Sequence, residues 1–280
     1  MKCLHAVMAL LWLCFVCPLA HASIMYGAGF SRKQLYTLSQ TTGAGTVIGS
    51  ISPMTDIRDI ASDTRPESFA IWGTSQGTGQ LFQMNPTTGR GTLVGSYLLP
   101  TGQEMRTLAF DIVGGKLYGT SDGTTGSAIN LYEISTTTGK ATLVAPVGIA
   151  TLGGMGADAL GNLYAMKEDT GQVFLIDKLL GTPTLVSTLP VTYISDLAFR
   201  PEDGQVFAVT HPGPVTSDTS TYKIDLARNT ATLLGPYDQS ETTMAGLAFG
   251  PAVPEPAFAS GMVCVPTLLL SRRRRSAAGN

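Results

Sequence analysis

Cysteine, histidine and charged residues are scarce in the central part of this 280-residue chain. All the cysteines lie near the two ends, and His211 is the one histidine beyond residue 21. A zinc site or a Cys/His catalytic dyad needs several such side chains. The composition of the central region therefore argues against a zinc site and against a Cys/His dyad. Without cysteine, this region also has no disulfide. The four cysteines are Cys3, Cys14, Cys17 and Cys264.

Two hydrolase-like signals are weak for related reasons. A Ser-His-Asp triad would have to use His211, but this residue begins a Pro/Gly-rich segment at 211–214, and we interpret it as a solvated loop histidine. Residues 73–77 and 119–123 match the G-x-S-x-G pattern of a nucleophile elbow. Both copies follow the same aromatic of a repeat, so we predict hairpin loops there. EF-hand, P-loop and dinucleotide-binding patterns are missing from the sequence.

Positive charge is also in short supply. All 20 Asp and Glu lie within residues 23–256, whereas five of the 18 Lys and Arg lie outside it, which leaves that region a net charge of about −7. Negative charge argues against nucleic acid and anionic lipid as partners. It also disfavours a strongly anionic polysaccharide unless divalent cations bridge the two.

What the chain does contain is a motif that recurs five times, an aromatic residue followed by glycine or alanine. The spacings between successive copies are 46, 46, 46 and 43 residues. A fixed period of this length is typical of repeat architectures. The copies are Tyr26-Gly27, Trp72-Gly73, Tyr118-Gly119, Tyr164-Ala165 and Phe207-Ala208.

Each repeat is predicted to contain four short strands, which in the third repeat are 108–111, 116–119, 130–134 and 141–144. The third strand alternates large apolar residues, so these side chains share one face of a sheet. A Thr- and Gly-rich turn follows, in which glycine supplies a positive φ for a tight hairpin. Four-stranded units of this length are typical of β-propeller blades, with a β-sandwich as the alternative.

The two ends of the repeat region complement each other. Leu-Ala-Phe marks a first strand at 108–110 and 197–199, and a further copy at 247–249 follows the last complete repeat. The first repeat, by contrast, opens near Tyr26 without a first strand. We therefore predict an all-β fold, a propeller of five four-stranded blades in which the C-terminal strand completes the N-terminal blade. Such closure removes exposed strand edges.

Residues 1–22 have the features of a secretory signal peptide. Lys2 supplies the positive start, residues 6–19 are apolar, and Ala20-His21-Ala22 is a small-x-small cleavage site. Cleavage is expected between Ala22 and Ser23. An apolar stretch of this length is too short for a membrane helix, which needs about 20 residues.

The C-terminal part has three successive features. A Pro-Glu-Pro motif precedes an apolar segment at 257–270, which is short for a membrane span and contains Pro266, and clustered arginines follow. Apolar residues followed by arginines are typical of a stop-transfer signal. The predicted division is a signal peptide at 1–22, a propeller at 23–252 and a sorting signal at 253–280. The motif residues are Val253, Pro254, Glu255, Pro256, Arg272, Arg273, Arg274 and Arg275.

This three-part order resembles the PEP-CTERM sorting signal of Gram-negative bacteria. The resemblance implies export across the inner membrane, transient membrane anchoring, cleavage by an exosortase near the motif, and delivery to the cell surface or extracellular matrix. It also implies a link to exopolysaccharide and biofilm. The central region is similar to repeat propellers with Leu-Tyr and Thr-Gly-x-x-Thr-Leu-Val units, a functionally mixed set that implies a fold and no activity.

Residues directly before the first strands are expected to face one mouth of the central channel. Carboxylates there could hold Ca²⁺, or a pair of them could serve acid/base chemistry on a glycan. Interleaved arginines favour plain ion pairs instead, so we predict no metal and no cofactor. Long segments at 97–106, 121–129 and 210–222 are expected at one face, where binding surfaces usually lie. The mouth candidates are Arg58, Asp59, Glu104, Arg106, Asp196 and Glu241.

Three functions are compatible with these features. The sequence favours a non-enzymatic binding or matrix protein that presents a propeller face to exopolysaccharide or a surface protein, because catalytic residue constellations are lacking. The alternative is a hydrolase or lyase that acts on carbohydrate through carboxylates at the channel mouth. A Ca²⁺-dependent, lactonase-like propeller rests on analogy of fold alone.

Overall fold

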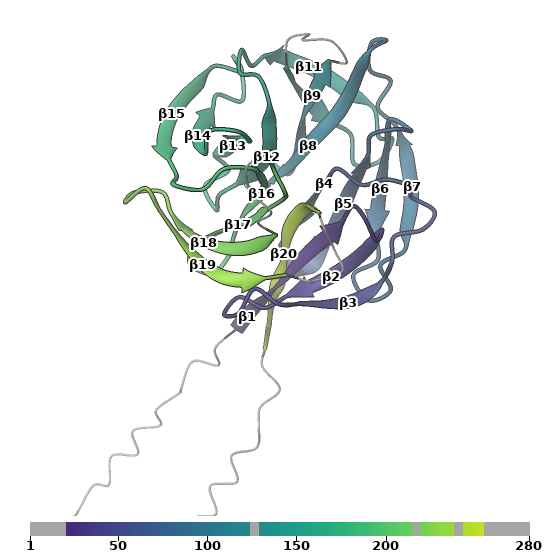
Figure 1. Cartoon of the computed structure of the whole chain (residues 1–280). Helices are drawn as coiled ribbons and strands as arrows, with labels where there is room; N and C mark the ends of the chain where they lie inside the picture. The colour runs from purple at the N-terminus through teal and green to yellow at the C-terminus, as the bar shows by residue number, and fades with distance from the viewer. Residues whose placement is uncertain (1–20, 124–128, 215–218, 238–242, 255–280) are drawn as a thin grey trace, which may run out of the picture. The chain divides into compact units, whose positions relative to one another are not determined.

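The aromatic residue of each repeat lies in the second strand of a four-stranded antiparallel sheet in the computed structural model of the protein (Figure 1). The structure describes residues 21–123, 129–214, 219–237 and 243–254. Residues 21–253 form one compact unit. Within the described residues, five such sheets surround a common axis, which confirms the predicted five-bladed propeller.

The blades follow the repeats with one permutation. The first blade contains β20 (Met244–Pro254), β1 (His21–Gly29), β2 (Gln34–Leu38) and β3 (Gly45–Ser50). The second contains β4 (Asp59–Asp63), β5 (Ala70–Ser75), β6 (Gln80–Met84) and β7 (Gly91–Ser96). A short 3₁₀ helix, η1 (Pro66–Ser68), joins β4 to β5.

The remaining three blades are uninterrupted in sequence. The third contains β8 (Gln103–Asp111), β9 (Lys116–Gly123), β10 (Asn130–Ile134) and β11 (Ala141–Pro146). The fourth contains β12 (Leu152–Ala157), β13 (Leu163–Lys167), β14 (Gln172–Ile176) and β15 (Pro183–Thr188). The fifth contains β16 (Ile194–Phe199), β17 (Val206–Thr210), β18 (Ser220–Asp225) and β19 (Thr230–Pro236).

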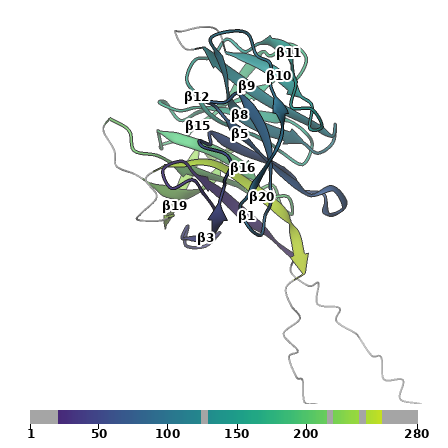
Figure 2. The ribbon, with the colours of Figure 1, turned by 90° about the vertical axis from the view of Figure 1, so that its right-hand side faces the viewer.

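Closure of the ring occurs in the first blade, where the last strand, β20, lies beside β1 (Figures 1 and 2). The backbone N–H of Phe30 donates to the carbonyl of Thr243 at 2.8 Å, so the end of β1 meets the start of β20. The predicted completion of the N-terminal blade by the C-terminal strand is confirmed. The two strands extend two residues beyond the predicted 23–252 boundaries, to His21 and Pro254.

The recurring aromatic residues hold neighbouring blades together. Trp72 stacks on Phe110 of the next blade with ring centroids 5.0 Å apart. Two further pairs repeat this contact between a second-strand aromatic and a first-strand phenylalanine of the following blade, Tyr164 with Phe199 and Phe207 with Phe249. Large aromatic pairs bury much apolar area and add about 0.5–1.5 kcal/mol beyond it. The repeat period therefore reflects packing between blades.

The turns between third and fourth strands also follow the prediction. Gly43, Gly89 and Gly139 all have positive φ, between 74° and 79°. The G-x-S-x-G segment at 73–77 leads from β5 into a hairpin, as predicted, and places Ser75 at the end of a strand. The hairpin loop predicted at 119–123 is wrong, because these residues lie within β9, which continues to Gly123.

Both ends of this unit lie at the same end of the axis, because β1 begins where β20 finishes (Figure 2). Glu202, which follows β16, accepts hydrogen bonds there from the backbone N–H and the hydroxyl of Ser23, both at 3.1 Å. Residues 1–20, Glu255, Pro256, the apolar segment and the four arginines lie outside the described residues. In the part that the structure describes, no helix has the length and hydrophobicity that a membrane crossing requires.

Candidate functional site

Two positions of each repeat meet at the mouth where the inner strands begin. The first is two residues before the apolar triplet of each inner strand, and the second is four residues after each second-strand aromatic. They surround a cavity of about 90 Å³. Its lining residues are Phe30, Arg58, Arg106, Gly153, Glu168, Ser195, His211, Thr243 and Ala245.

Arg106 connects the third and fourth blades. Its two terminal nitrogens donate to Asp122 at 2.9 Å and to Glu168 at 2.7 Å. The Arg106 side chain is about one-quarter exposed, so solvent screens this pairing less than it does at an open surface. One of the two predicted mouth arginines is thus neutralised by carboxylates, as the sequence analysis expected.

His211 extends this network to the fifth blade. Its Nε2 lies 2.7 Å from Glu168 Oε1 and its Nδ1 lies 2.9 Å from the carbonyl oxygen of Pro212. Both partners only accept hydrogen bonds, so the geometry suits a ring that carries both protons. The hydrogen bond to Glu168 raises the pKa of His211 above its usual range, against the effect of burial. The structure corrects the sequence interpretation, since His211 is a half-buried member of the mouth.

Glu168 is held as a carboxylate by these neighbours. Burial alone would raise its pKa, but the hydrogen bond from His211 and the charge of Arg106 outweigh it, and the net pKa is lowered. Because both His211 nitrogens are occupied, the imidazole has no lone pair to accept a proton from Ser195. A Ser-His-Glu nucleophile is therefore not assembled here.

Arg58 differs from Arg106 because it makes no ion pair among the described residues. Its Nε donates to Gln76, and its guanidinium lies 5.3 Å from the centroid of the Phe30 ring. Gln76 in turn donates to Glu104, which lies beside the mouth and outside the cavity lining. Burial, followed by the charge of Arg106, lowers the pKa of Arg58. Its two terminal nitrogens have no hydrogen-bond acceptor among the described residues and face a site of reduced solvation.

Ser195 provides a second unused polar group. The residue is 7% exposed, and its hydroxyl has no hydrogen-bond partner. Most buried hydroxyls in proteins have a partner, so an unsatisfied one requires an explanation. Ser195 and Arg58 are on the wall of the same cavity.

One residue deeper, Asp59 and Asp196 form a carboxyl pair that closes the channel. Both are fully buried, so they do not line the mouth. Asp59 accepts the backbone N–H of Ile60 at 2.6 Å and of Leu108 in the next blade at 2.7 Å. Asp196 likewise accepts the N–H of Leu197 at 2.7 Å and of Leu247 in the next blade at 2.6 Å.

The two carboxyls also hydrogen-bond to each other, which requires a shared proton. Burial, together with the neighbouring charge of Asp196, raises the pKa of Asp59 well above its usual range, and burial raises that of Asp196. Glycine makes room at this level. A β-carbon at Gly246 would collide with the backbone of Asp59, and one at Gly154 would collide with Asp196.

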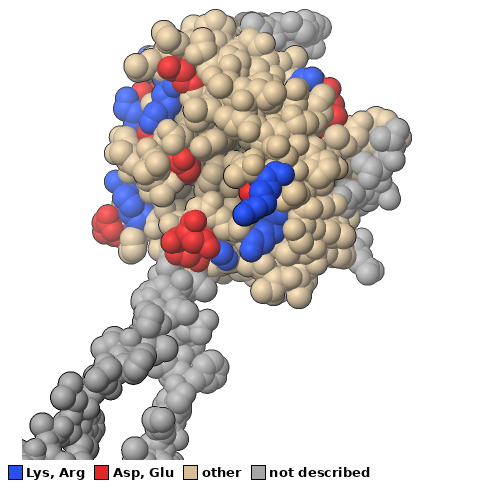
Figure 3. Space-filling model, turned by 90° about the vertical axis from the view of Figure 1, so that its left-hand side faces the viewer, with Lys and Arg blue, Asp and Glu red and all other residues tan. Residues whose placement is uncertain are grey.

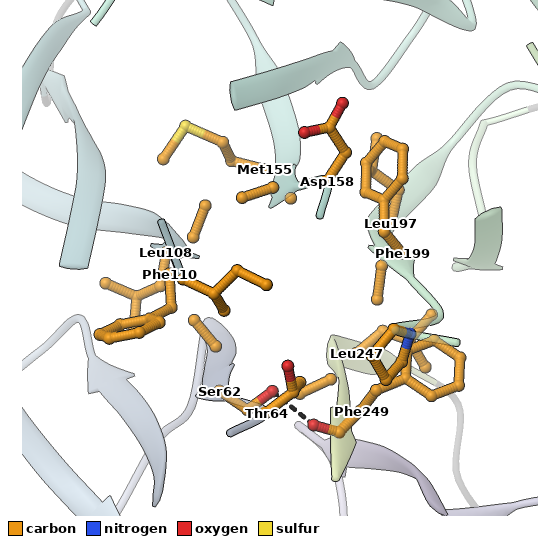
Figure 4. Close-up of a pocket in the computed structure, with 18 of the residues that line it drawn as sticks. Ser62, Thr64, Leu108, Phe110, Met155, Asp158, Leu197, Phe199, Leu247 and Phe249 are labelled. Atoms are coloured by element: carbon orange, nitrogen blue, oxygen red, sulfur yellow. Dashed lines mark hydrogen bonds between the residues drawn. The ribbon is translucent and has the colours of Figure 1, made fainter. Parts of the chain in front are cut away.

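The opposite end of the channel, called the apolar end below, is lined mainly by apolar residues, with Ser62, Thr64, Asp158 and Arg200 also in the lining. A cavity of about 50 Å³ lies there between the inner strands (Figure 4). The five inner strands contribute equivalent large apolar residues, Ile60, Leu108, Met155, Leu197 and Leu247. In Figure 4 the side chains of Leu108, Met155, Leu197 and Leu247 surround the cavity together with Phe110, Phe199, Phe249, Thr64 and Asp158. The Ser62 hydroxyl donates to the carbonyl of Phe249 at 2.6 Å.

Two sequence candidates are not placed by this geometry. Glu241 lies outside the described residues. The calcium possibility has no candidate within residues 21–123, 129–214, 219–237 and 243–254, where no three His, Cys, Asp or Glu residues converge in a way that could hold a metal ion.

No family model and no curated protein matches the chain. The fold is similar to a chain in the crystal structure of a nidogen/laminin complex, with a TM-score of 0.54, 12% identity and coverage of 83% of this chain and 99% of that one. It is also similar to a structure from work on the de novo evolutionary emergence of a symmetrical protein, with a TM-score of 0.52, 17% identity and coverage of 83% and 100%. Such identities support the propeller fold alone.

Five cavity residues that carry polar or aromatic groups were not predicted at the mouth from the sequence, among them Ser195 and Thr243. Three of them occupy one offset of the repeat, because Phe30, Glu168 and His211 each follow a recurring aromatic by four residues. Gln76 and Asp122 occupy this offset in the other two blades and bond to the two arginines. Counting four residues beyond each aromatic would have found this half of the mouth. Ser195 shares the inner-strand position of Arg58 and Arg106.

Proposed function

We propose that the protein is an exported, non-enzymatic binding or matrix protein whose propeller presents the Arg58 mouth to exopolysaccharide or a cell-surface protein. The observation that carries this proposal is the combination of unused and used groups at the mouth. Arg58 and Ser195 have unused hydrogen-bonding groups, whereas Arg106, Glu168 and His211 are engaged with one another. A concave site with a few convergent polar groups that lack partners is typical of ligand binding.

The position of the chain ends supports presentation of this mouth. Both ends of the propeller lie at the opposite end of the axis, near Ser23 and Glu202. In our proposal, residues 1–22 direct export, the C-terminal segment anchors the chain transiently, and an exosortase of a Gram-negative bacterium releases it. A chain held at that end would direct the Arg58 mouth away from its anchor, toward the extracellular matrix.

The surface charge is compatible with an extracellular glycan of low charge. On the face shown in Figure 3, most of the surface is uncharged, and Lys, Arg, Asp and Glu stand in small groups that mix both signs. Polar, weakly charged surfaces suit contact with sugars, whose hydroxyls need donors and acceptors more than net charge.

The hydrolase or lyase alternative has less support. Glycoside hydrolysis needs two accessible carboxylates roughly 5–10 Å apart. Glu168 is the one carboxylate on the cavity wall among the described residues, and its pKa is lowered where a general acid needs a raised one. Asp59 and Asp196 are closed off from solvent.

Thermal unfolding of the purified protein tests the proposal. We would add the host's exopolysaccharide or a panel of glycans, each with Ca²⁺ and with a chelator. A ligand that binds only the folded state raises the melting temperature by mass action. We expect a shift that persists in chelator, without release of reducing ends. Release of reducing ends would support the hydrolase instead, and no shift with any glycan would contradict glycan binding and favour a protein partner.

A further inference from the structure

We propose that the mouth cavity binds the carboxylate of a single acidic sugar residue, with Arg58 and Ser195 as its donors and Glu168 as the acceptor of a neighbouring sugar hydroxyl. This inference rests on the proposed binding function and specifies its ligand. It begins with Arg58, whose guanidinium has no ion pair among the described residues although its side chain is half-buried. A guanidinium in this state gains from a bidentate acceptor, and a carboxylate matches its planar fork.

The neighbours of Arg58 prepare it for such a ligand. Phe30 lies under the guanidinium at 5.3 Å, and Gln76 takes the Nε–H. In the part of the chain that the structure describes, the donors of the two terminal nitrogens meet no protein acceptor. Fixing the fork in advance reduces the side-chain entropy that binding would otherwise cost.

Ser195 supplies a further donor on the same wall. Its hydroxyl is buried without a partner, and Ser195 lines the same cavity as Arg58. A carboxylate oxygen would satisfy it. Binding would then remove the free-energy penalty of leaving this buried hydroxyl without a hydrogen bond.

Charge selects the class of anion. The cavity wall carries Arg58, Arg106 and a protonated His211 against the carboxylate of Glu168, and Asp122 pairs with Arg106 from outside the lining, which leaves a net charge of one positive unit. This balance attracts a monoanion, whereas the fixed negative charge of Glu168 opposes a dianion such as phosphate. Glu168 is also the acceptor that a hydroxyl beside the carboxylate would need. A sugar acid offers both groups on adjacent carbons.

Size and net charge restrict the ligand to one acidic residue at a time. The cavity volume of about 90 Å³ exceeds what one water molecule needs, so it leaves room for a carboxylate. The rest of the ring would remain at the rim. The net charge of about −7 in residues 23–256 repels a polyanion but tolerates one acidic residue in an otherwise neutral glycan.

The test is titration calorimetry of the purified protein at low salt with glucuronate, glucose and inorganic sulfate. We expect glucuronate to bind at least about tenfold more tightly than glucose or sulfate, the ratio that one charge-assisted pair provides. Equal binding of glucuronate and glucose would overturn the proposal. Sulfate binding as tight as that of glucuronate would overturn the carboxylate assignment.

Variants locate the site. Arg58→Gln should weaken glucuronate binding about tenfold or more and Ser195→Ala about threefold, whereas Arg58→Lys should be intermediate because it keeps charge and loses the fork. The matched control is Arg90→Gln, in an exposed hairpin turn, which should change nothing. The melting temperature of each variant checks its folding. If Arg58→Gln is misfolded, the Ser195→Ala and Arg58→Lys titrations decide, and unchanged affinity in the folded variants overturns the proposal.

These results separate the subsite from the function. If exopolysaccharide stabilises the wild-type protein and Arg58→Gln equally, the result supports the proposed function and contradicts the carboxylate subsite. Glucuronate binding that depends on Arg58, in a protein that exopolysaccharide does not stabilise, supports the subsite and contradicts exopolysaccharide as the partner.

Discussion

The two ends of the channel are formed by the same five inner strands, yet they follow opposite rules. At the apolar end the five equivalent positions are nearly alike, with Ile60, Leu108, Met155, Leu197 and Leu247 all large and apolar. At the mouth, the position two residues earlier holds Arg58, Arg106, Gly153, Ser195 and Ala245. Equivalent positions thus hold similar residues at the apolar end, called the repeated end, and different residues at the mouth. The Asp59–Asp196 pair lies between the two.

This contrast distinguishes residues that maintain the fold from residues that are free to do something else. Five identical environments around an axis select the same kind of side chain five times, because close packing has the same requirement in each. Where the repeat gives way to five different residues, ring packing no longer dictates them. The predictions below test whether stability belongs to the repeated end and the central pair, and binding to the mouth.

The largest effect is expected at the boundary between the ends. Asp59→Leu should lower the free energy of unfolding by about 3–5 kcal/mol, because it strands Asp196 as a buried carboxyl without its partner and removes the acceptor of the Leu108 N–H. Urea unfolding measures this loss. Asp59→Asn keeps a carbonyl acceptor and should cost less. Equal losses for the two variants would show that the paired proton is unimportant.

The same pair predicts a pH dependence with a definite sign. Above the ordinary aspartate pKa of 3.8, the unfolded chain releases protons that the folded pair retains, because burial raises the pKa of both carboxyls. This contribution to stability is complete below that value and is lost as the pH rises through the folded pKa. Wild-type protein should lose more unfolding free energy than Asp59→Asn between pH 5 and 9, which urea titrations would measure.

The next prediction compares the two ends directly. Leu108→Ala, at a residue 1% exposed beside the apolar cavity, should lower the free energy of unfolding by about 2–5 kcal/mol and leave glucuronate binding unchanged. Arg58→Gln should do the reverse, with a stability change within about 0.5 kcal/mol. Unfolding and calorimetric titration of both variants give a two-by-two comparison. A loss of binding in folded Leu108→Ala would contradict the separation of roles.

A smaller effect is expected from the pairing of His211 with Glu168 within the mouth. Because the Glu168 hydrogen bond raises the pKa of His211, the pair stabilises the fold fully below the ordinary histidine value of 6.5, and this is lost as the pH rises through the folded pKa. His211→Gln should therefore lower the unfolding free energy by up to about 1 kcal/mol at pH 6 and by less at pH 9. The Glu168→Gln variant should show little such dependence. A difference that is the same at both pH values would exclude the pairing.

The internal repeat explains how much could be predicted. Blade number, strand order and closure follow from the spacing of Tyr26, Trp72 and their equivalents, because each aromatic packs against the next blade and so recurs with the blade. Arg58 and Arg106 were also identified, since residues before an inner strand must lie at a mouth. The boundary between the mouth and the buried channel was not predicted. Asp59, which was also expected at the mouth, follows Arg58 directly and is fully buried.

The missed residues show the limit of a pattern that follows one strand. Glu168, His211 and Phe30 reach the cavity from the ends of second strands, so only their common offset from the aromatic reveals them. Their pairing could not be deduced even so. Whether an acid meets an arginine of its own blade, as Asp122 meets Arg106, or bridges two blades, as Glu168 does, depends on side-chain rotamers around the ring.

The smallest effect is expected at the far end, where the chain enters and leaves. If export removes residues 1–22 as proposed, the backbone nitrogen of Ser23 becomes a charged amino group beside Glu202, its acceptor at 3.1 Å. Glu202→Gln should then lower the unfolding free energy of the cleaved protein by about 0.2–1 kcal/mol, the range of a partly exposed ion pair. In uncleaved protein the same variant loses only a hydrogen bond to a neutral amide, so its cost should be smaller and insensitive to salt. Urea unfolding of both forms at low and high salt compares them. A cost that is equal in the two forms would show that the new amino group of Ser23 makes no ion pair with Glu202.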